Sequence, residues 1–394
     1  MPVTLSLEEL RGWIRLSLEP GLGPAQARNL LAAIGLPQQI YDLSAGSLGK
    51  FVPTDLARQL ARAPTEELQA AIARVLDWLP QPGHHLLTLA DPAYPRALLD
   101  IHDPPLLLYI NGNPDYLSRP IISIVGARSA SAGGTDNARA FARHLAQQGW
   151  CIGSGLAHGI DTAAHEGALQ AGPDAGGTIA VLGTGIDIVY PAGNRDLAHR
   201  IAAAGALVSE FPLGTRALPY QFPKRNRLVA GMSRGVLVVE AAKQSGSLIT
   251  ARLASEMGRE VFAIPGSIHS PLSRGCHALI RQGAKLVESA QDIHDELGQP
   301  IAPLEANPNS TTAAKSRPAR RPAALQADIP DDAPAIDADP TDILVLDALG
   351  YDPVHLDTLQ LRTQLDLPTL NSHLLKLELS DTVVRQADGR YQRR

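Results

Sequence analysis

The chain has 394 residues, is 44% hydrophobic and carries a formal net charge of -5 at pH 7. This length allows about two to four domains, and the net charge excludes a uniformly basic nucleic-acid coat but not a local basic patch. Two distant cysteines, no charged-then-apolar leader and no apolar stretch near roughly eighteen residues predict a cytoplasmic protein without membrane contact.

Residues 1–79 are predicted to form a small helical domain of the SAM-like or helix-hairpin-helix-like kind. Apolar residues recur at helical spacing in four segments, Leu7–Leu18, Ala25–Ile34, Leu56–Leu60 and Leu68–Leu79. Between the first two, Glu19–Leu31 has a Pro-Gly-x-Gly turn before a small-residue helix. The turn amides of a helix-hairpin-helix can meet a phosphate. The alternative is an ordinary glycine-containing turn inside the helical domain.

Residues 80–300 are predicted to form an α/β domain. Short unbroken apolar runs alternate with helical segments, at Ile121–Val125, Trp150–Ile152, Thr178–Leu182, Ala206–Ser209, Gly235–Val239 and Val261–Ile264. Such runs are typical of strands that are buried on both faces. The repeated order of strand, helix and strand predicts a doubly wound parallel sheet. Cys151 lies in one of these runs and is expected to be buried.

Residues 301–340 are predicted to be a disordered linker. The segment contains seven prolines, many alanines and no aromatic residue. A basic cluster is followed by an acidic run, so the segment has too little apolar surface to form a core of its own.

Residues 341–394 are predicted to form a winged-helix domain. Three helical segments are followed by a hairpin around Asp388 and Gly389. The third helix of such a domain can read a DNA groove while the wing contacts the backbone. Four arginines lie on or beside the predicted wing: Arg385, Arg390, Arg393 and Arg394. The third helix itself is poor in cations, so contact with DNA and contact with a protein both remain open.

The carboxyl ends of the predicted parallel strands form the expected ligand site, because ligands of open parallel sheets bind there. The loops after five of the strands offer glycine, small hydroxyls or cations: Gly126–Ser129, Gly153–Gly159, Gly183–Gly185, Glu240–Ser247 and Pro265–Ser267. Glycine allows close approach to the backbone, helix N-termini present N–H groups, and lysine and arginine add charge. Together these loops predict an anionic ligand.

A cationic stretch lies between Glu210 and Glu240, where the chain has no acid. Its five cations are Arg216, Lys224, Arg225, Arg227 and Arg234. Cations at a helix N-terminus oppose the helix dipole, so uncompensated cations here predict a phosphate backbone as ligand. Three neighbouring aromatic residues, Phe211, Tyr220 and Phe222, are candidates for stacking on unpaired bases. For Phe222 the alternative is a place in the core.

The signatures of nucleotide enzymes are missing. The loop after the first predicted strand, VGARSASAGG, does not have the dinucleotide-binding fingerprint, and the chain contains no P-loop motif and no nucleophile-elbow motif. His158, Asp161 and His165 form a conceivable metal set. The simpler interpretation is that Asp161 caps the following helix and His165 packs inside it. We therefore expect no metal, no cofactor and no catalytic residue.

A set of longer motifs points to a known family. They are IVGAR, SGLAHGID with AAHEGAL, TIAVLGTGID with YPAGN, SEFPLGT, FPKRNRLVAGMS, VLVVEA with SGSLITARLA, and GREVFAIPG, in this order. This sequence closely resembles the DprA/Smf family of DNA-processing proteins. The resemblance implies a non-enzymatic single-stranded DNA-binding protein that protects incoming DNA and loads RecA during natural transformation, or competence, and recombination. It also implies an extended Rossmann-like core that forms a homodimer and binds DNA in a positively charged pocket.

The resemblance also implies which residues bind DNA. The matching pocket positions are Gly126, Arg128, Ser129, Gly155, Lys224, Arg225, Asn226 and Arg227, with Lys243, Ser245, Gly246 and Ser247 in a neighbouring loop. Two positions depart from the family pattern. Ala192 stands where relatives often have a cation, so Asn194 and Arg195 are candidates there instead. Cys276 replaces a usual asparagine.

Two other classes of protein compete with this interpretation. A nucleotide phosphoribohydrolase of the lysine-decarboxylase-like type uses the same kind of sheet and carries a PGGxGTxxE signature. Here the corresponding place has EAAKQSGSLITA, without that arrangement. A pure scaffold suits the long linker, but it leaves the cationic loops without a purpose.

Overall fold

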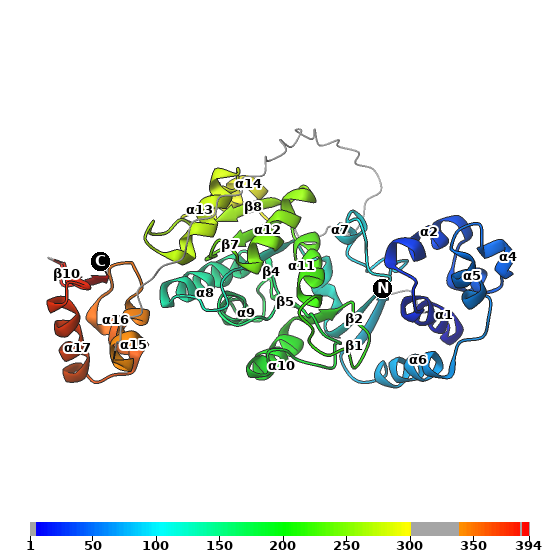
Figure 1. Cartoon of the computed structure of the whole chain (residues 1–394), viewed down its shortest axis with the longest axis horizontal. Coiled ribbons are helices and arrows are strands. Elements are labelled where there is room, and N and C mark those ends of the chain that lie inside the picture. Colours follow the sequence, from blue (N-terminus) through cyan, green and yellow to red (C-terminus); the bar gives the residue numbers. More distant parts are fainter. Residues whose placement is uncertain (1–4, 301–338, 387, 394) are drawn as a thin grey trace.

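The computed structural model describes residues 5–300, 339–386 and 388–393. Figure 1 shows a central sheet with helices, a helical N-terminal part in blue at one end and a small C-terminal part in orange and red at the other. Of the predicted linker, residues 301–338 lie outside the described residues. Among the described residues, no helix has the length and hydropathy needed to cross a membrane.

A single large sheet organises the central part. Its order is β1-β2-β6-β5-β4-β3-β7-β8-β9. The strands are β1 His84–Thr88, β2 Leu107–Gly112, β3 Ile121–Val125, β4 Cys151–Ser154, β5 Thr178–Val181, β6 Ala206–Ser209, β7 Gly235–Val238, β8 Glu260–Ala263 and β9 Lys285–Leu286. All neighbours from β6 through β9 are parallel, while β2 pairs antiparallel with both β1 and β6. The predicted doubly wound parallel sheet is confirmed.

Three strands were not predicted. Strand β1 begins with two histidines and is only partly buried, and β9 has two residues that are both exposed, so neither has the apolar run of a central strand. Strand β2 is apolar and buried, but it joins the sheet antiparallel, outside the regular alternation of strand and helix.

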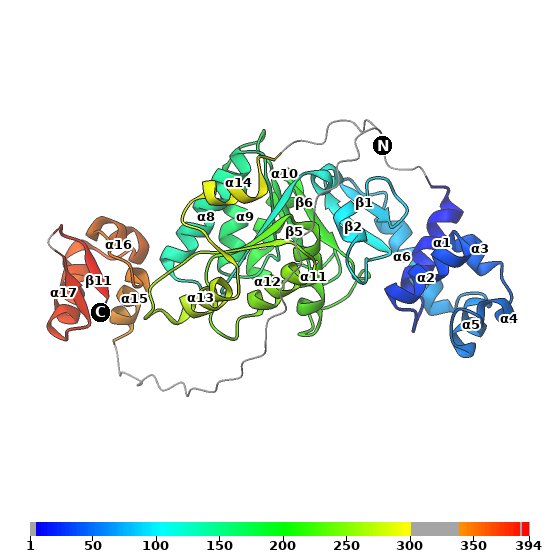
Figure 2. The same cartoon turned by 90° about the horizontal axis from the view of Figure 1, so that it is seen from above.

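Helices cover both faces of the sheet (Figure 2). One face carries α8 Ala132–Gln147, α9 Ile160–Gln170, α10 Arg195–Ala204 and α14 Ala290–Leu297. The other carries α7 Arg96–Leu99, α11 Gln221–Met232, α12 Gly246–Glu256 and α13 Arg274–Arg281. Short 3-10 helices occur at Pro114–Ser118, Ala192–Asn194 and Pro271–Ser273.

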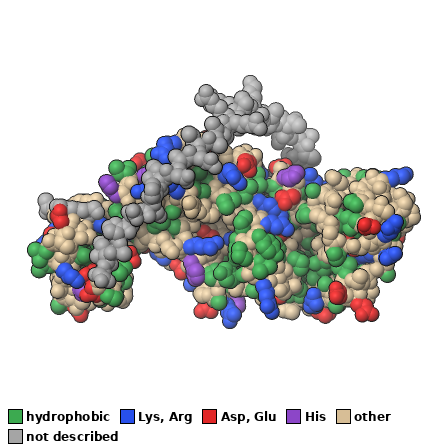
Figure 3. Space-filling model, in the orientation of Figure 1, with side chains coloured by type: hydrophobic (Ala, Val, Ile, Leu, Met, Phe, Trp, Pro, Cys, Tyr) green, Lys and Arg blue, Asp and Glu red, His purple; other side chains and the backbone are tan. Residues whose placement is uncertain are grey.

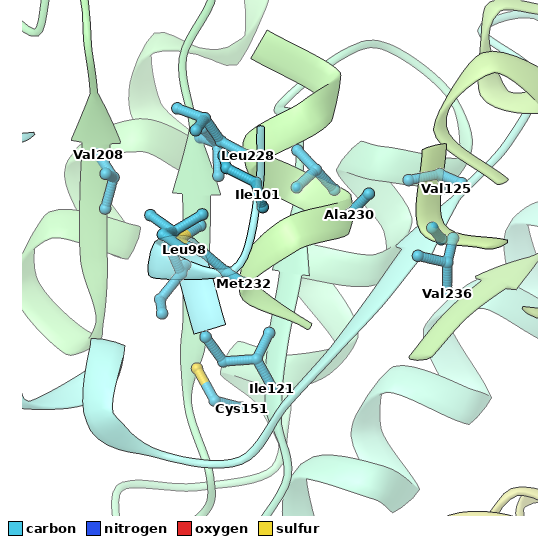
Figure 4. Close-up of a cluster of buried hydrophobic side chains, with 14 of the residues drawn as sticks. Leu98, Ile101, Ile121, Val125, Cys151, Val208, Leu228, Ala230, Met232 and Val236 are labelled. Carbon is cyan, nitrogen blue, oxygen red and sulfur yellow. The ribbon is translucent and has the colours of Figure 1, made fainter. Parts of the chain in front are cut away.

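Aliphatic side chains fill the space between the sheet and each helical layer. Figure 4 shows one of these clusters, in which Leu228 of α11 lies near Ile101, Met232 of α11 lies near Leu98, and Ile121 lies near Cys151. Cys151 has no exposed surface, as predicted, and burial raises the pKa of its thiol to about 12. The burial of these apolar side chains is the main stabilising contribution to this part of the fold.

The N-terminal part consists of helices, as predicted. They are α1 Leu7–Leu18, α2 Pro24–Ile34, α3 Pro37–Tyr41, α4 Ala45–Leu48, α5 Thr54–Leu60 and α6 Glu66–Trp78. Trp13 of α1 and Trp78 of α6 belong to a core that also contains Tyr109 of β2. The indole of Trp78 meets the Tyr109 ring edge-on, with ring centroids 6.0 Å apart. The helices are therefore packed on the antiparallel edge of the sheet.

The glycine turn before α2 is occupied by protein groups. The N–H of Gly23 donates to Gln26 Oε1 at 3.4 Å. Glu19, at the entry to the turn, is only 5% exposed and accepts a hydrogen bond from Gln59 Nε2 at 2.9 Å. Glu19 is also paired with Arg15 at 3.4 Å. The Gly23 N–H and the Glu19 carboxylate thus have partners within the protein, so the ordinary-turn interpretation fits better.

The C-terminal part is a winged helix, as predicted. It contains α15 Pro340–Leu349, α16 Leu356–Thr363, α17 Leu367–Leu379 and the hairpin of β10 Val383–Arg385 with β11 Tyr391–Arg393. Both views place it beside α8 of the central part. There Arg362 of α16 forms an ion pair of 2.8 Å with Asp136 of α8.

Candidate nucleic-acid interface

The crest of the sheet, where β3 to β8 end, gathers the predicted site loops. The strand order runs outward from β3 in both directions, through β4 and β5 on one side and β7 and β8 on the other. The switch point of the topology therefore lies between β3 and β7, which is the usual ligand crevice in such sheets. The loop after β3 carries Arg128 and Ser129, and both are exposed.

The cations of α11 divide into exposed and buried ones. Lys224 has a side chain 44% exposed and lies 3.9 Å from Glu210. Arg227 has a side chain only 8% exposed; it pairs with Asp103 at 3.2 Å and with Glu210 more closely. The expectation of uncompensated cations is therefore wrong for Arg227, because Glu210, which bounds the cationic stretch, and Asp103, which is distant in sequence, both fold against it. Sequence separation from the nearest acid does not predict spatial separation.

Arg225 is also buried, at 5% exposure. Its guanidinium donates hydrogen bonds to the carbonyl oxygens of Gly155 and Val181, and its Nε donates to Asn226 Oδ1 at 3.1 Å. Burial lowers the pKa of Arg225 to about 10, so the side chain is still cationic at neutral pH. The guanidinium therefore holds two crest segments together and does not face solvent.

The loop after β4 is held from both sides. Asp161 accepts hydrogen bonds from the N–H groups of Gly155 at 3.1 Å and Ala157 at 3.3 Å. Asn194 donates to the carbonyl of Leu156 at 2.9 Å, and is itself 6% exposed. Two predictions are corrected here. Asp161 binds the preceding loop instead of capping α9, and Asn194 is a buried brace for that loop instead of a contact for DNA.

The conceivable metal set is not assembled. His165 is fully buried and its Nδ1 lies 2.7 Å from Thr178 Oγ1, while burial lowers its pKa to about 3. Asp161 is engaged by the loop amides, and His158 is exposed. In the described part of the chain one other group has the spacing of metal ligands, Asp339, Asp342 and His373 of the winged helix. There Lys376 Nζ already lies 2.5 Å from Asp342 Oδ2, which supplies the positive charge.

The loop before α12 is a helix cap with an exposed cation. Ser245 Oγ accepts from the N–H of Ser247 at 3.4 Å and lies 2.7 Å from the Ser247 hydroxyl. Ser247 is 8% exposed, whereas Gly246 and Lys243 are exposed. Lys243 and Gly246 are therefore the members of this predicted group that a large ligand reaches most easily.

Aromatic side chains flank the exposed cations. The ring of Phe222 is half-buried, with Arg128 Cζ 5.9 Å from its centroid and the ring of Tyr190 5.4 Å away. Tyr190 is 51% and Tyr220 is 69% exposed. Phe211 is only 7% exposed and lies under Lys224, so the prediction that it stacks on bases is wrong. We call Arg128, Lys224, Tyr190, Tyr220 and Phe222 the cation–aromatic surface.

Tyr190 was missed by sequence reasoning. It lies in the YPAGN motif, for which the predictions name Asn194 and Arg195 as replacements for a missing cation. The available signal was an aromatic residue in a crest loop, after a strand and before a proline. Figure 3 shows lysine and arginine side chains beside a hydrophobic patch near α11 on the central part.

Family models identify the chain. Residues 85–298 match the model for DNA recombination-mediator protein A, and residues 329–389 match the DprA winged helix domain. The chain belongs to the DNA recombination-mediator protein A family. The first match covers the whole crest, and the second covers the winged helix up to the turn of its hairpin.

Curated relatives agree with this assignment. DNA processing protein DprA of Streptococcus pneumoniae is 48% identical over 206 residues, which cover 52% of this chain and 72% of that protein. Protein Smf of Synechocystis is 33% identical over 405 residues, which cover 97% of this chain and 98% of that protein. Protein Smf of Escherichia coli is 45% identical, and the match spans 63% of its length, which is less than two thirds.

A solved structure supports the fold. The X-ray structure of DprA from Streptococcus pneumoniae matches with a TM-score of 0.64 and 37% sequence identity. The match covers 73% of this chain and 98% of that chain. This chain and that DprA structure therefore share a fold over the matched part.

Proposed function

We propose that this protein binds single-stranded DNA on the cation–aromatic surface, without catalysis and without a cofactor. The observation that carries the proposal is the Arg128 guanidinium beside the half-buried ring of Phe222, next to the exposed ring of Tyr190. Cations bind phosphates of any sequence, and aromatic faces stack on any unpaired base. This combination is typical of proteins that bind single strands without sequence preference.

The preference for single strands follows from the aromatic side chains. Stacking on an aromatic ring contributes about 1 to 3 kcal/mol per base, and only an unstacked base presents its face. Tyr190 and Tyr220 are exposed enough to make such contacts. The names of the relatives, DNA processing protein DprA, support DNA as the ligand class.

The predicted DNA-binding residues take two roles in this proposal. Arg128, Ser129, Lys224, Lys243 and Gly246 are exposed and contact DNA. The others support the crest from inside or beside it: Gly126, Gly155, Arg225, Asn226, Arg227, Ser245 and Ser247. The supporting role of Arg225 rests on its hydrogen bonds to Gly155 and Val181, and that of Arg227 rests on Glu210 and Asp103.

In the cell, we propose, the protein protects incoming single strands and loads RecA on them during natural transformation and recombination. The family description, a recombination mediator, supports this role. We also propose a homodimer formed through the central core and a cytoplasmic location, and domains at 1–79, 80–300 and 341–394 joined by a linker at 301–340. The resemblance of the crest motifs to the family supports the RecA and dimer proposals.

Fluorescence anisotropy with a labelled poly-dT oligonucleotide and a matched duplex tests the binding proposal. We expect tight single-strand binding, much poorer duplex binding, and at least a tenfold loss of affinity, about 1.4 kcal/mol, when Arg128 and Lys224 are both changed to alanine. Arg252→Ala is the matched control. Its side chain is 70% exposed and lies in the second half of α12, away from the crest.

Two results would contradict the proposal. The first is equal affinity of the wild type and the double variant at the same salt concentration. The second is equal affinity for duplex and single strand. For the RecA role, the assay is RecA filament assembly on single strands coated with a single-strand-binding protein, where the wild type should shorten the lag and the double variant should not.

A further inference from the structure

The switch point between β3 and β7 already holds a negative charge of the protein. Glu240 follows β7, and its carboxylate accepts hydrogen bonds from the N–H of Ser131 at 2.9 Å and from the Ser131 hydroxyl at 2.6 Å. Ser131 is the N-cap of α8, and its hydroxyl also accepts from the N–H of Gly134 at 2.9 Å. The carboxylate therefore lies at the positive end of α8.

The carboxylate is also in close contact with the first turn of α8. A Cβ atom added to Gly134 would lie 2.3 Å from Glu240 Cδ, so only glycine leaves room for the acid. A sheet of this type binds the phosphate of a nucleotide at the N-terminus of the helix that follows the strand at the switch point. Here that strand is β3 and the helix is α8. In this protein, the carboxylate of Glu240 stands where that phosphate would be.

The backbone closes the same crevice. The N–H of Ala127 donates to the carbonyl of Glu240 at 2.8 Å, and a Cβ on Gly126 would lie 2.9 Å from that carbonyl oxygen. A dinucleotide fingerprint requires the opposite arrangement, in which glycine opens the backbone to a pyrophosphate. Here the glycine at 126 makes room for the Glu240 backbone and for Ile160.

Acidic side chains continue beyond Glu240. The neighbouring cavity, about 400 Å³ in volume, is lined by Glu240 and, from the winged helix, by Asp347, Asp352 and Arg393. Three acids and one cation line this cavity, so a small anion would be repelled from its interior. On the other side of β3, the cation–aromatic surface has the opposite character.

We infer that Glu240 is a specificity-determining residue that excludes nucleotide phosphates from the switch point by occupying the N-terminus of α8. The inference concerns mononucleotides and holds whether or not the proposed DNA binding is correct. It also explains how a sheet of the nucleotide-binding type lacks a nucleotide site, and it disfavours a phosphoribohydrolase, which would need this position for its substrate.

The test measures AMP binding by isothermal titration to the full chain and to single variants. Glu240→Ala removes the carboxylate and should raise the affinity for AMP about tenfold or more, since an anion at a helix N-terminus is stabilised by the freed N–H groups and the dipole. Glu240→Gln keeps the shape and an acceptor for Ser131 but removes the charge. Its affinity for AMP should rise about threefold, because the repulsion is removed.

Asp187→Asn is the matched control, since Asp187 also accepts from a loop amide, the N–H of Gly214 at 2.9 Å, but far from α8 in the chain. It should leave AMP binding unchanged. An unchanged AMP affinity in folded Glu240→Ala overturns the inference. If Glu240→Ala does not fold, Glu240→Ser, which also frees the N-terminus of α8, takes its place, and an unchanged AMP affinity in that variant overturns the inference.

The same proteins separate this inference from the proposed function. Gain of AMP binding in the variants, with no poly-dT binding by the wild type, would leave the inference standing and remove the proposed function. Poly-dT binding by the wild type, without any gain of AMP binding in the variants, would leave the proposed function standing and remove the inference. Release of free adenine from AMP by the wild type would contradict both.

Discussion

The guanidinium of Arg225 lies against the backbone of Gly155 and donates a hydrogen bond to its carbonyl. The two residues are on different elements, α11 and the loop after β4, and both are buried. A glycine is required at 155 because a Cβ there would lie 2.6 Å from Arg225 Cζ. This contact joins the loop to the start of α11, where the cation–aromatic surface is formed.

Gly155→Ala should destabilise the protein. The added methyl group must displace the buried guanidinium, and overpacking of this kind costs about 1 to 3 kcal/mol. The measurement is the free energy of unfolding in urea. Gly246→Ala is the control, because a Cβ at 246 meets no atom within 4 Å; it should be neutral or slightly stabilising. Equal unfolding curves for both variants would contradict the close packing at 155.

Arg225→Ala should mainly lower the stability of the fold, whereas Arg128→Ala should mainly lower the affinity for DNA. Removal of the buried Arg225 leaves the carbonyls of Gly155 and Val181 without their donor and leaves Asp161 without a nearby cation, which should cost about 3 kcal/mol of stability. The exposed Arg128 should change stability by less than about 0.5 kcal/mol. Urea unfolding and poly-dT binding at one salt concentration distinguish them. A stable Arg225→Ala variant that loses only DNA affinity would show that Arg225 contacts DNA directly.

The sheet and the winged helix were predictable from the sequence because both follow from periodicity. Strands buried on both faces give apolar runs such as Ile121–Val125, and the three C-terminal helices with the hairpin give a recognisable order. Strand β9 could not be predicted this way, since its two residues are exposed and pair only through backbone atoms.

The site was predictable in its location but not in its details. The sequence places cations and glycines at the crest, but it cannot tell which cation finds an acid. Arg227 finds Asp103, a partner more than a hundred residues away. The amides of the loop at Gly155 and of the helix N-termini were expected to be available for an anion, yet Asp161 binds the N–H of Gly155 and Glu240 binds the N–H of Ser131 at the start of α8. Such pairings depend on the tertiary arrangement of loops, which periodicity does not encode.

The salt dependence of DNA binding should report the exposed cations. For a single strand, the slope of log K against log salt concentration decreases in magnitude by about 0.7 for each phosphate that the protein no longer neutralises. Arg128→Ala and Lys224→Ala should each show this decrease, and Arg227→Lys should not, since Arg227 is paired inside the protein. Anisotropy titrations at several salt concentrations are sufficient. If both alanine variants keep the wild-type slope of log K against log salt concentration, neither side chain binds a phosphate.

Stability should fall in mild acid because of His165. The pKa of His165 is lowered from 6.5 to about 3 by burial, so the unfolded state binds the proton more readily than the folded state. The stabilising contribution is complete above pH 6.5 and is lost progressively as the pH falls toward 3. Between about pH 7.5 and 5.5 this histidine should account for a loss of about 1.4 kcal/mol. Urea unfolding of wild type and His165→Asn at both pH values isolates this part; equal pH dependence of the two proteins would contradict it.

The position of the winged helix beside α8 should be detectable by an engineered crosslink. A Cβ at Gly133 would lie 3.8 Å from Asp352 Oδ2, which brings these two positions close enough for a disulfide after a small movement. We expect Gly133→Cys with Asp352→Cys to crosslink under mild oxidation, seen as a mobility shift without reductant. The pair Gly133→Cys with Leu379→Cys is the control, since Leu379 is 82% exposed on α17. Asp136→Asn should slow the crosslink, because it removes the ion pair with Arg362, while stability changes by about 0.5 kcal/mol or less. Equal crosslinking of both cysteine pairs would show that the winged helix has no preferred place on the core.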